Sequence, residues 1–257
     1  MTGDQSVLRT NLALSMLQVI LHNQNRKQPD LKLFEIGKIY YTQDGKPKED
    51  NYLCLAVTGN RYQRSWEAKP EEVNFFDLKG VVQSLAEILG MIELKFSSFQ
   101  SNHFSSPISL KIENSGNQVG ELGLIARPIL DQLDIKNNVF LAELNLDKTI
   151  SAVEEEKIFQ PLPKYPPVER DIAIIVDKSA PALQIIQQIK AWAKGLAEEV
   201  GIFDVYSGKQ VPPDKKSLAF YIRYRSADRT LTEEEVNTVQ EKIIKNLQQE
   251  FQAQLRS

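Results

Sequence analysis

Residues 217–225, SLAFYIRYR, alternate between apolar and polar side chains in the last third of this 257-residue chain. One side of an extended strand would carry Leu218, Phe220, Ile222 and Tyr224, and the other Ser217, Ala219, Tyr221, Arg223 and Arg225. Successive side chains of a strand point to opposite faces of its sheet. The pattern therefore predicts a sheet that is covered on one face and open on the other.

The segments around this strand predict a βαββαβ order. Further strands are expected at 171–176, 200–206 and 253–256, and apolar residues at helical spacing indicate helices ending near residues 194 and 251. Ser179 is a candidate N-cap for the first helix, with Pro181 in its first turn. Thr232 and Glu235 have the spacing of a capping box at the start of the second. This order predicts a ferredoxin-like domain with both helices on one face of the sheet.

A proline-rich segment separates this domain from the first part of the chain. Four prolines lie between residues 161 and 167, and three glutamates precede them at 154–156. Proline removes a backbone donor and restrains the residue before it, so neither a helix nor a central strand can continue there. We therefore expect a first module at 1–153, a linker at 154–167 and the ferredoxin-like domain at 168–257.

The first module is expected to be a mixed α+β domain with mostly antiparallel strands. A helix capped by Thr10 or Asn11 and apolar on most of its circumference is predicted to run to about residue 22. Strands are predicted at 31–41, 52–58, 109–113, 118–126 and 138–146. An amphipathic helix closed by Gly90 and a short helix at 128–134 complete the pattern.

The composition offers little for catalysis. The chain has two histidines, His22 and His103, and one cysteine, Cys54, which lies in an apolar run and is expected to be a small buried residue. No phosphate-binding loop, serine elbow or metal-ligand spacing occurs, so no catalytic residue and no metal ligand is expected. No apolar run is long enough to cross a bilayer, and we expect a cytoplasmic protein.

The open sheet face is the better candidate for a site. Tyr206, Ser217, Tyr221, Arg223 and Arg225 would present aromatic rings, a hydroxyl and positive charge, with Lys209, Lys215 and Lys216 nearby. Unpaired RNA bases are bound by stacking on aromatic rings, by hydrogen bonds and by cations on the phosphates. A net charge of −3 requires that such binding be local. An ordinary polar face or a protein-binding surface is the alternative reading.

Several motifs of the last part resemble the anticodon-binding domain that ends bacterial phenylalanyl-tRNA synthetase β subunits. They are YPPVERDIAIIVD at 165–177, FDVYSG at 203–208, KKSLAF at 215–220 and RTLTEEEV at 229–236. The segments SVLRT at 6–10, LFEIG at 33–37 and NFFDLKG at 74–80 resemble the synthetase-like module of the same subunits. The resemblance therefore covers nearly the whole chain and implies a class II synthetase-like antiparallel sheet before the ferredoxin-like domain.

This resemblance implies a function without catalysis in this chain. In the family the synthetase-like module has lost its active site and packs against the catalytic α subunit in an (αβ)2 assembly, which uses ATP and magnesium. Here no arginine follows the strand at 33–40 for about twenty residues, and no GxGxxR occurs, so the guanidinium groups that hold ATP phosphates are missing. The family residues that meet the first anticodon base of the phenylalanine tRNA correspond to Ala173, Tyr206 and Ser217.

The sequence also departs from the family pattern. HFSS at 103–106 and Arg127-Pro128 stand where the family usually has HPGR and His-Pro, and family members are several times longer, so a fragment is expected. Two other readings remain open from the residues alone. One is a free-standing regulatory or scaffold protein whose ferredoxin-like sheet binds a small molecule or a protein; the other is an unrecognised enzyme in the first module.

Overall fold

The computed structural model describes residues 7–62, 65–67, 69–91, 94–151 and 162–256. These residues divide into two compact units, with the boundary between Ile158 and Phe159. Residues 154–161 of the expected linker lie outside the described residues, and residues 162–167 lead into the first strand of the second unit. Each unit is described by itself below.

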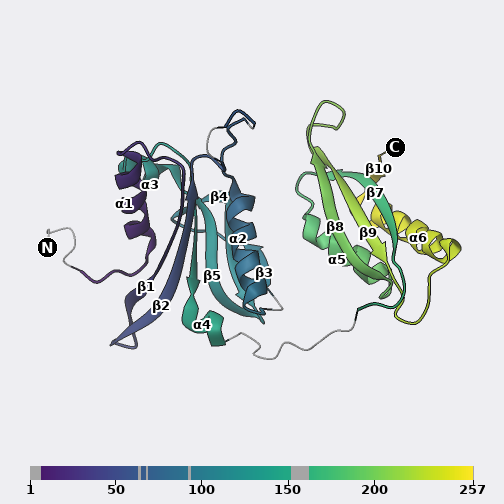
Figure 1. The fold of residues 1–257 in the computed structure, drawn as a ribbon, viewed down its shortest axis with the longest axis horizontal. Coiled ribbons are helices and arrows are strands. Elements are labelled where there is room, and N and C mark those ends of the chain that lie inside the picture. Colours follow the sequence, from purple (N-terminus) through teal and green to yellow (C-terminus); the bar gives the residue numbers. More distant parts are fainter. Residues whose placement is uncertain (1–6, 63–64, 68, 92–93, 152–161, 257) are drawn as a thin grey trace. The chain divides into compact units, whose positions relative to one another are not determined.

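Six antiparallel strands form the sheet of the N-terminal unit, in the order β1-β2-β6-β5-β4-β3 (Figure 1). The strands are β1 Leu31–Gln43, β2 Lys46–Thr58, β3 Leu94–Ser98, β4 Phe104–Asn114, β5 Asn117–Ile125 and β6 Val139–Asn145. The five strands that the sequence predicts correspond to β1, β2, β4, β5 and β6, and β3 is an addition at the edge of the sheet. The expected mixed, antiparallel α+β module is confirmed.

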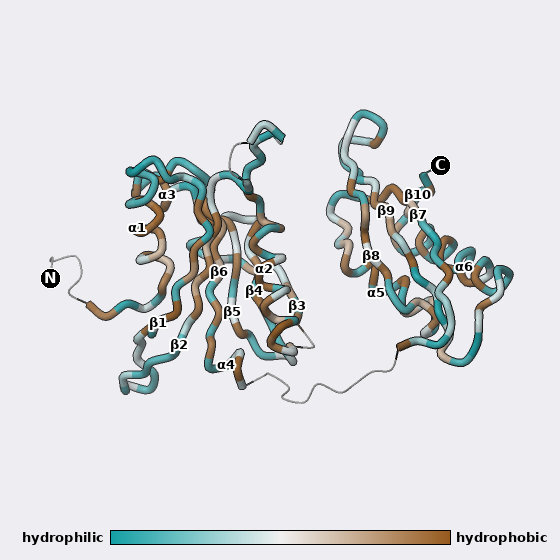
Figure 2. The backbone as a smooth tube through the Cα atoms, in the orientation of Figure 1, coloured by the Kyte–Doolittle hydropathy of each residue, from teal (hydrophilic) through white to brown (hydrophobic). Residues whose placement is uncertain are grey.

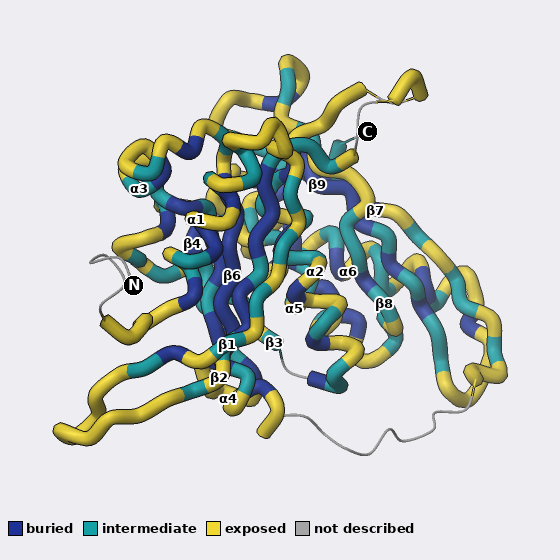
Figure 3. The backbone as a smooth tube through the Cα atoms, turned by 60° about the vertical axis from the view of Figure 1, so that its left-hand side comes forward, coloured by how far each residue is buried: buried dark blue, intermediate teal, exposed yellow. Residues whose placement is uncertain are grey.

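Helices cover both faces of this sheet. On one face α1 (Ala13–Gln24) packs through Met16, Leu17 and Ile20, and on the other α2 (Phe75–Ile88) packs through Leu78 and Val82. Between the two layers every residue of β6 is buried, which Figure 3 shows as a continuous dark blue strand. The short helices α3 (Arg127–Gln132) and α4 (Leu146–Ser151) flank β6 in the sequence. Cys54 is fully buried in the α1-side core, and burial raises the pKa of its thiol.

The helix starts of this unit follow local side-chain bonds. Asn74 and Asp77 form a capping box at α2, and Gly90, with φ of 74°, follows its last turn as expected. The expected cap of α1 needs a correction, because the helix begins at Ala13 and the cap position is Leu12, which has no side-chain acceptor. Asn11 still contributes, since its Oδ1 accepts a 3.3 Å hydrogen bond from the Leu14 amide.

The C-terminal unit is a four-stranded antiparallel sheet in the order β10-β7-β9-β8. Its elements are β7 Val168–Asp177, α5 Ala182–Trp192, β8 Ala197–Tyr206, β9 Lys215–Tyr224, α6 Glu233–Phe251 and β10 Gln254–Leu255. Leu218, Phe220, Ile222 and Tyr224 of β9 join residues of both helices in one core. Figure 2 shows hydrophobic and hydrophilic residues interspersed along these strands, as a sheet with one covered face requires. The ferredoxin-like prediction is confirmed.

One helix start in this unit differs from the prediction. The N-cap of α5 is Pro181 and carries no side-chain hydrogen bond, so Ser179 does not cap this helix. At α6 the predicted capping box forms: Thr232 accepts from the Glu235 amide at 3.3 Å, and the Glu235 carboxylate accepts from the Thr232 amide at 2.9 Å. Arg229 also pairs with this carboxylate, and the bond holds the pKa of Glu235 at about 2.

We expect Thr232→Ala to lower the free energy of unfolding of the C-terminal unit by about 1 kcal/mol, the usual cost of an N-cap hydroxyl. The measurement is urea denaturation of the wild type and the variant, followed by a probe of this unit. Ser179→Ala is the matched control and should unfold like the wild type, because Ser179 does not cap α5. Equal losses in both variants would contradict the capping assignment.

Candidate RNA-binding face

The three positions implied by the family resemblance lie together on the open face of the C-terminal sheet. Tyr206 on β8 is paired directly with Ser217 on β9, and Ala173 on β7 is paired with Ala219, two residues further along β9. Paired residues point to the same face, and residues two apart on a strand do so as well. The sheet register therefore brings Ala173, Tyr206 and Ser217 into one corner.

Arg256 completes this corner, although the sequence pattern does not single it out. Its amide donates to the Ala173 carbonyl at 2.9 Å, and its guanidinium carbon lies 5.1 Å from the centroid of the Tyr206 ring. The guanidinium also donates to Ser217 Oγ at 3.3 Å and to Gln210 Oε1 at 3.4 Å. The sequence indicates the position of Arg256 only weakly, because the edge strand before it is very short. Arg256 lies two residues after Gln254 of that strand, so the alternation of side chains places both on the open face.

The Tyr206 ring is held beside the backbone of Gly208. A Cβ atom at Gly208 would collide with the phenol end of that ring, so glycine leaves the space that the ring occupies. Tyr206 remains half-buried, whereas Ser217 beneath the guanidinium is only 3% exposed. The corner therefore offers a fixed aromatic ring, a guanidinium beside it and a buried hydroxyl.

Tyr221 and Arg223 lie on the same face but in a different chemical environment. Arg223 donates to Glu169 at 2.9 Å and to Glu199 at 2.8 Å, so two carboxylates compensate its charge. The Tyr221 hydroxyl donates to Glu199 at 2.6 Å, and this bond raises the pKa of Tyr221. These two residues therefore form a closed network with acidic partners beside the corner.

The remaining predicted residues do not share one location. Arg225 donates to Glu198 at 3.0 Å and to the Tyr165 carbonyl at 3.1 Å. Lys216 alternates with Ser217 onto the covered face, where its ammonium donates to the Ala180 carbonyl at 2.6 Å and burial lowers its pKa. Lys209 and Lys215, by contrast, line an open groove of about 610 Å³ next to Tyr206, together with Lys178.

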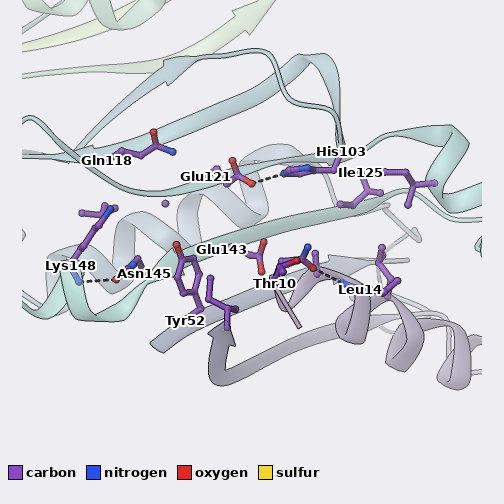
Figure 4. A pocket seen from close by; sticks show the side chains of 17 residues that line it. Thr10, Leu14, Tyr52, His103, Gln118, Glu121, Ile125, Glu143, Asn145 and Lys148 are labelled. Atoms are coloured by element: carbon purple, nitrogen blue, oxygen red, sulfur yellow. Dashed lines mark hydrogen bonds and ion pairs between the residues drawn. The ribbon is translucent and has the colours of Figure 1, made fainter. Parts of the chain in front are cut away.

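The N-terminal unit has a cavity of about 630 Å³ on the α1 face of its sheet (Figure 4). Its described lining includes two carboxylates, Glu121 and Glu143, and only two basic side chains, His103 and Lys148. His103 is already paired with Glu121 at 2.6 Å. A triphosphate needs several cations around it, so these residues do not fit ATP. Among the described residues no group of three or more His, Cys, Asp or Glu side chains is arranged to hold a metal ion.

The comparisons with known proteins agree with both folds. The family model for the phenylalanyl tRNA synthetase beta chain CLM domain matches residues 1–146, and that for the ferredoxin-fold anticodon binding domain matches residues 163–256. These two matches place the chain in the class of aminoacyl-tRNA synthetase subunits. Within that class, the chain belongs to the phenylalanyl-tRNA synthetase β-chain family.

Curated relatives carry the same assignment over the whole chain. The phenylalanine–tRNA ligase β subunit of Syntrophotalea carbinolica is 35% identical over 100% of this chain and 32% of its own length. That of Bacillus subtilis is 32% identical, again over 100% of this chain and 32% of the relative. The chain thus spans about a third of the length of these relatives.

A solved pyrrolysyl-tRNA synthetase from Desulfitobacterium hafniense covers 55% of this chain, and the chain covers 48% of that protein, at 14% identity and a TM-score of 0.43.

No helix in the described part of the chain is long and apolar enough to cross a membrane.

The Tyr221 bond gives a pH prediction. The folded-state pKa of Tyr221 lies above its unfolded value of about 10. The stabilisation that the Tyr221–Glu199 hydrogen bond gives to the folded state is therefore present below about pH 10 and is lost as the pH rises through the folded pKa. We expect Glu199→Gln to lower the pKa of Tyr221, measured by NMR titration of the tyrosine ring carbons. Glu241→Gln, on the exposed side of α6, is the control. An unchanged Tyr221 titration in Glu199→Gln would show that the bond does not form in solution.

Proposed function

We propose that this chain is a non-catalytic, carboxy-terminal portion of a phenylalanine–tRNA ligase β subunit that binds the anticodon stem-loop of the phenylalanine tRNA. The observation that supports this most is the corner formed by Ala173, Tyr206, Ser217 and Arg256 within a domain of the anticodon-binding family. In this proposal ATP and magnesium are used by the catalytic α subunit, the assembly is (αβ)2, and the protein works in the cytoplasm.

The corner suggests how an unpaired base would be held. The base would stack on the Tyr206 ring, which Gly208 keeps in place, and its edge would reach the Ser217 hydroxyl and the backbone near Ala173. Arg256 lies over the ring in the free protein and would have to give way to the base. Its guanidinium could then bind a phosphate or stack on the base, as arginine does in RNA complexes.

Positive charge for the phosphates would come from the groove beside the corner rather than from the middle of the sheet. Lys178, Lys209 and Lys215 line this groove, and only Lys215 has a nearby carboxylate, Asp177 at 3.5 Å, among the ion pairs of the described residues. Arg223 would have to exchange two carboxylates for a phosphate. We therefore narrow the proposed RNA contacts to the corner and the groove, with Arg225 and Lys216 in supporting structural roles.

We further propose that the α subunit docks on the α2 side of the N-terminal sheet. Phe34 and Ile36 of β1 pair with Leu55 and Leu53, which belong to the α2-side core, yet they remain 72% and 62% exposed. The sheet thus continues its apolar face beyond the area that α2 covers. A row of exposed apolar residues next to a buried core is typical of a protein interface. Phe76 and Ile88 are likewise exposed, on α2.

The RNA proposal is tested by binding of the chain to the anticodon stem-loop of the phenylalanine tRNA. We expect Tyr206→Ala to weaken binding by about 1–3 kcal/mol, the usual contribution of one stacked base. Tyr206→Phe keeps the ring and should bind nearly as well as the wild type. Fluorescence anisotropy at two salt concentrations gives the affinities and the salt dependence.

Two controls separate this site from the rest of the face. Tyr221→Ala removes an aromatic side chain of the same sheet face, outside the corner, and should change the affinity little. A stem-loop with its first anticodon base replaced should bind the wild type more weakly, and Tyr206→Ala should no longer distinguish the two RNAs. Equal losses with Tyr206→Ala and Tyr221→Ala would contradict the assignment of the corner.

The docking proposal predicts that Phe34→Glu combined with Ile36→Glu weakens binding to the catalytic α subunit by at least about tenfold, since a charge in an apolar interface core is costly. Co-expression followed by sedimentation velocity measures the assembly. Leu183→Glu, at an exposed leucine of α5, is the matched control. Unchanged assembly in the double variant would place the interface elsewhere on the chain.

A further inference from the structure

The cavity of the N-terminal unit has the build of a small-molecule site. Its volume of about 630 Å³ lies in the range of ligand pockets in proteins. One wall is apolar, with contributions from α1, the sheet and α3: Leu14, Leu17, Ile39, Ile125 and Ile129. The polar lining includes Glu121, Glu143 and Asn145 of the sheet, and Figure 4 shows these side chains around a shared space.

Two carboxylates on neighbouring strands dominate that polar side. Glu121 of β5 and Glu143 of β6 are direct partners in the antiparallel register, so their side chains leave the sheet side by side. Glu143 is only 7% exposed. Like charges in such positions repel each other, and the cost rises when water is excluded. The cavity lining therefore places two carboxylates side by side, with His103 and Lys148 as its basic side chains.

The neighbouring groups offset this charge only in part. His103 pairs with Glu121, and the amide of Leu12, at the start of α1, donates to Glu143 Oε1 at 2.6 Å. Burial still raises the pKa of Glu143, and the Glu121 charge adds to the rise. The hydrogen bond from the Leu12 amide gives Glu143 a structural role at the start of α1. That role alone does not account for the second carboxylate, Glu121, or for the cavity beside the two.

We propose that this cavity binds a small organic cation, namely a primary ammonium group attached to an apolar body. The ammonium group would lie between Glu121 and Glu143, where its three donors match the carboxylate oxygens. The body would pack on the leucine and isoleucine wall. Tyr52 also lines the cavity and would add an aromatic ring to the surroundings of the cation. This site is separate from the proposed RNA contacts, which lie in the other unit.

The proposal is tested with three probes that share one branched aliphatic body and differ in charge: 3-methylbutylamine, 3-methylbutanol and 4-methylpentanoate. Calorimetric titration of the full chain at pH 7.5 should give binding of the amine at least about tenfold tighter than that of the alcohol, the usual discrimination of a charged hydrogen bond. The carboxylate should not bind. Chemical shift changes in the NMR spectrum should map to the cavity.

Variants identify the carboxylates. Glu121→Gln should weaken binding of the amine at least about tenfold without unfolding the chain, because Glu121, unlike Glu143, accepts no hydrogen bond from the start of α1. Glu143→Gln should do the same and is checked by circular dichroism, since it also contacts α1. Glu87→Gln, an exposed carboxylate on α2 on the other side of the sheet, should bind like the wild type. Equal affinity for amine and alcohol, tighter binding of the carboxylate, or no amine binding at millimolar concentration would overturn the proposal.

Discussion

The pairing of β9 with both β7 and β8 is the constraint on which the C-terminal unit depends. β9 is the strand whose alternate residues fill the core, and it lies between the two strands that carry Ala173 and Tyr206. A shift of one residue would exchange Ser217 and Ala219 with Leu218 and Phe220. Such a shift would expose the core residues and dismantle the corner together, so the fold and the candidate site are fixed by the same register.

The two sheets use this alternation differently. In the N-terminal unit helices lie on both faces, and the central strand β6 is buried throughout. In the C-terminal unit both helices pack on one core, and the other face keeps Tyr206, Tyr221 and Arg223 accessible. A doubly covered sheet leaves a cavity between the sheet and a helix, and such a cavity suits a small ligand. A sheet with an open face offers an extended surface, which suits a nucleic acid.

Local signals in the sequence predict much of this structure. The alternation of 217–225 gives the covered and open faces, and the Thr232–Glu235 spacing gives the start of α6, because both depend on residues close together in the chain. Contacts between distant residues are not encoded in this way. Arg223 meets Glu169 across 54 positions, and Arg256 meets Ser217 across 39. The sequence therefore predicts the face of the sheet but does not show which arginine is compensated, and it gives no sign of the cavity beneath α1.

For RNA binding, the hydrogen-bond partners of each arginine matter more than the net charge of the chain. Arg223 and Arg225 donate to carboxylates, so binding a phosphate there would exchange one anion for another and gain little. Arg256 donates to the neutral oxygens of Ser217 and Gln210, and its charge is held against an aromatic ring. Replacing weak neutral acceptors by a phosphate or a base edge is a net gain in electrostatic energy. Although the net charge of the chain is −3, the Arg256 guanidinium can thus act as a cation beside the Tyr206 ring and the Ser217 hydroxyl.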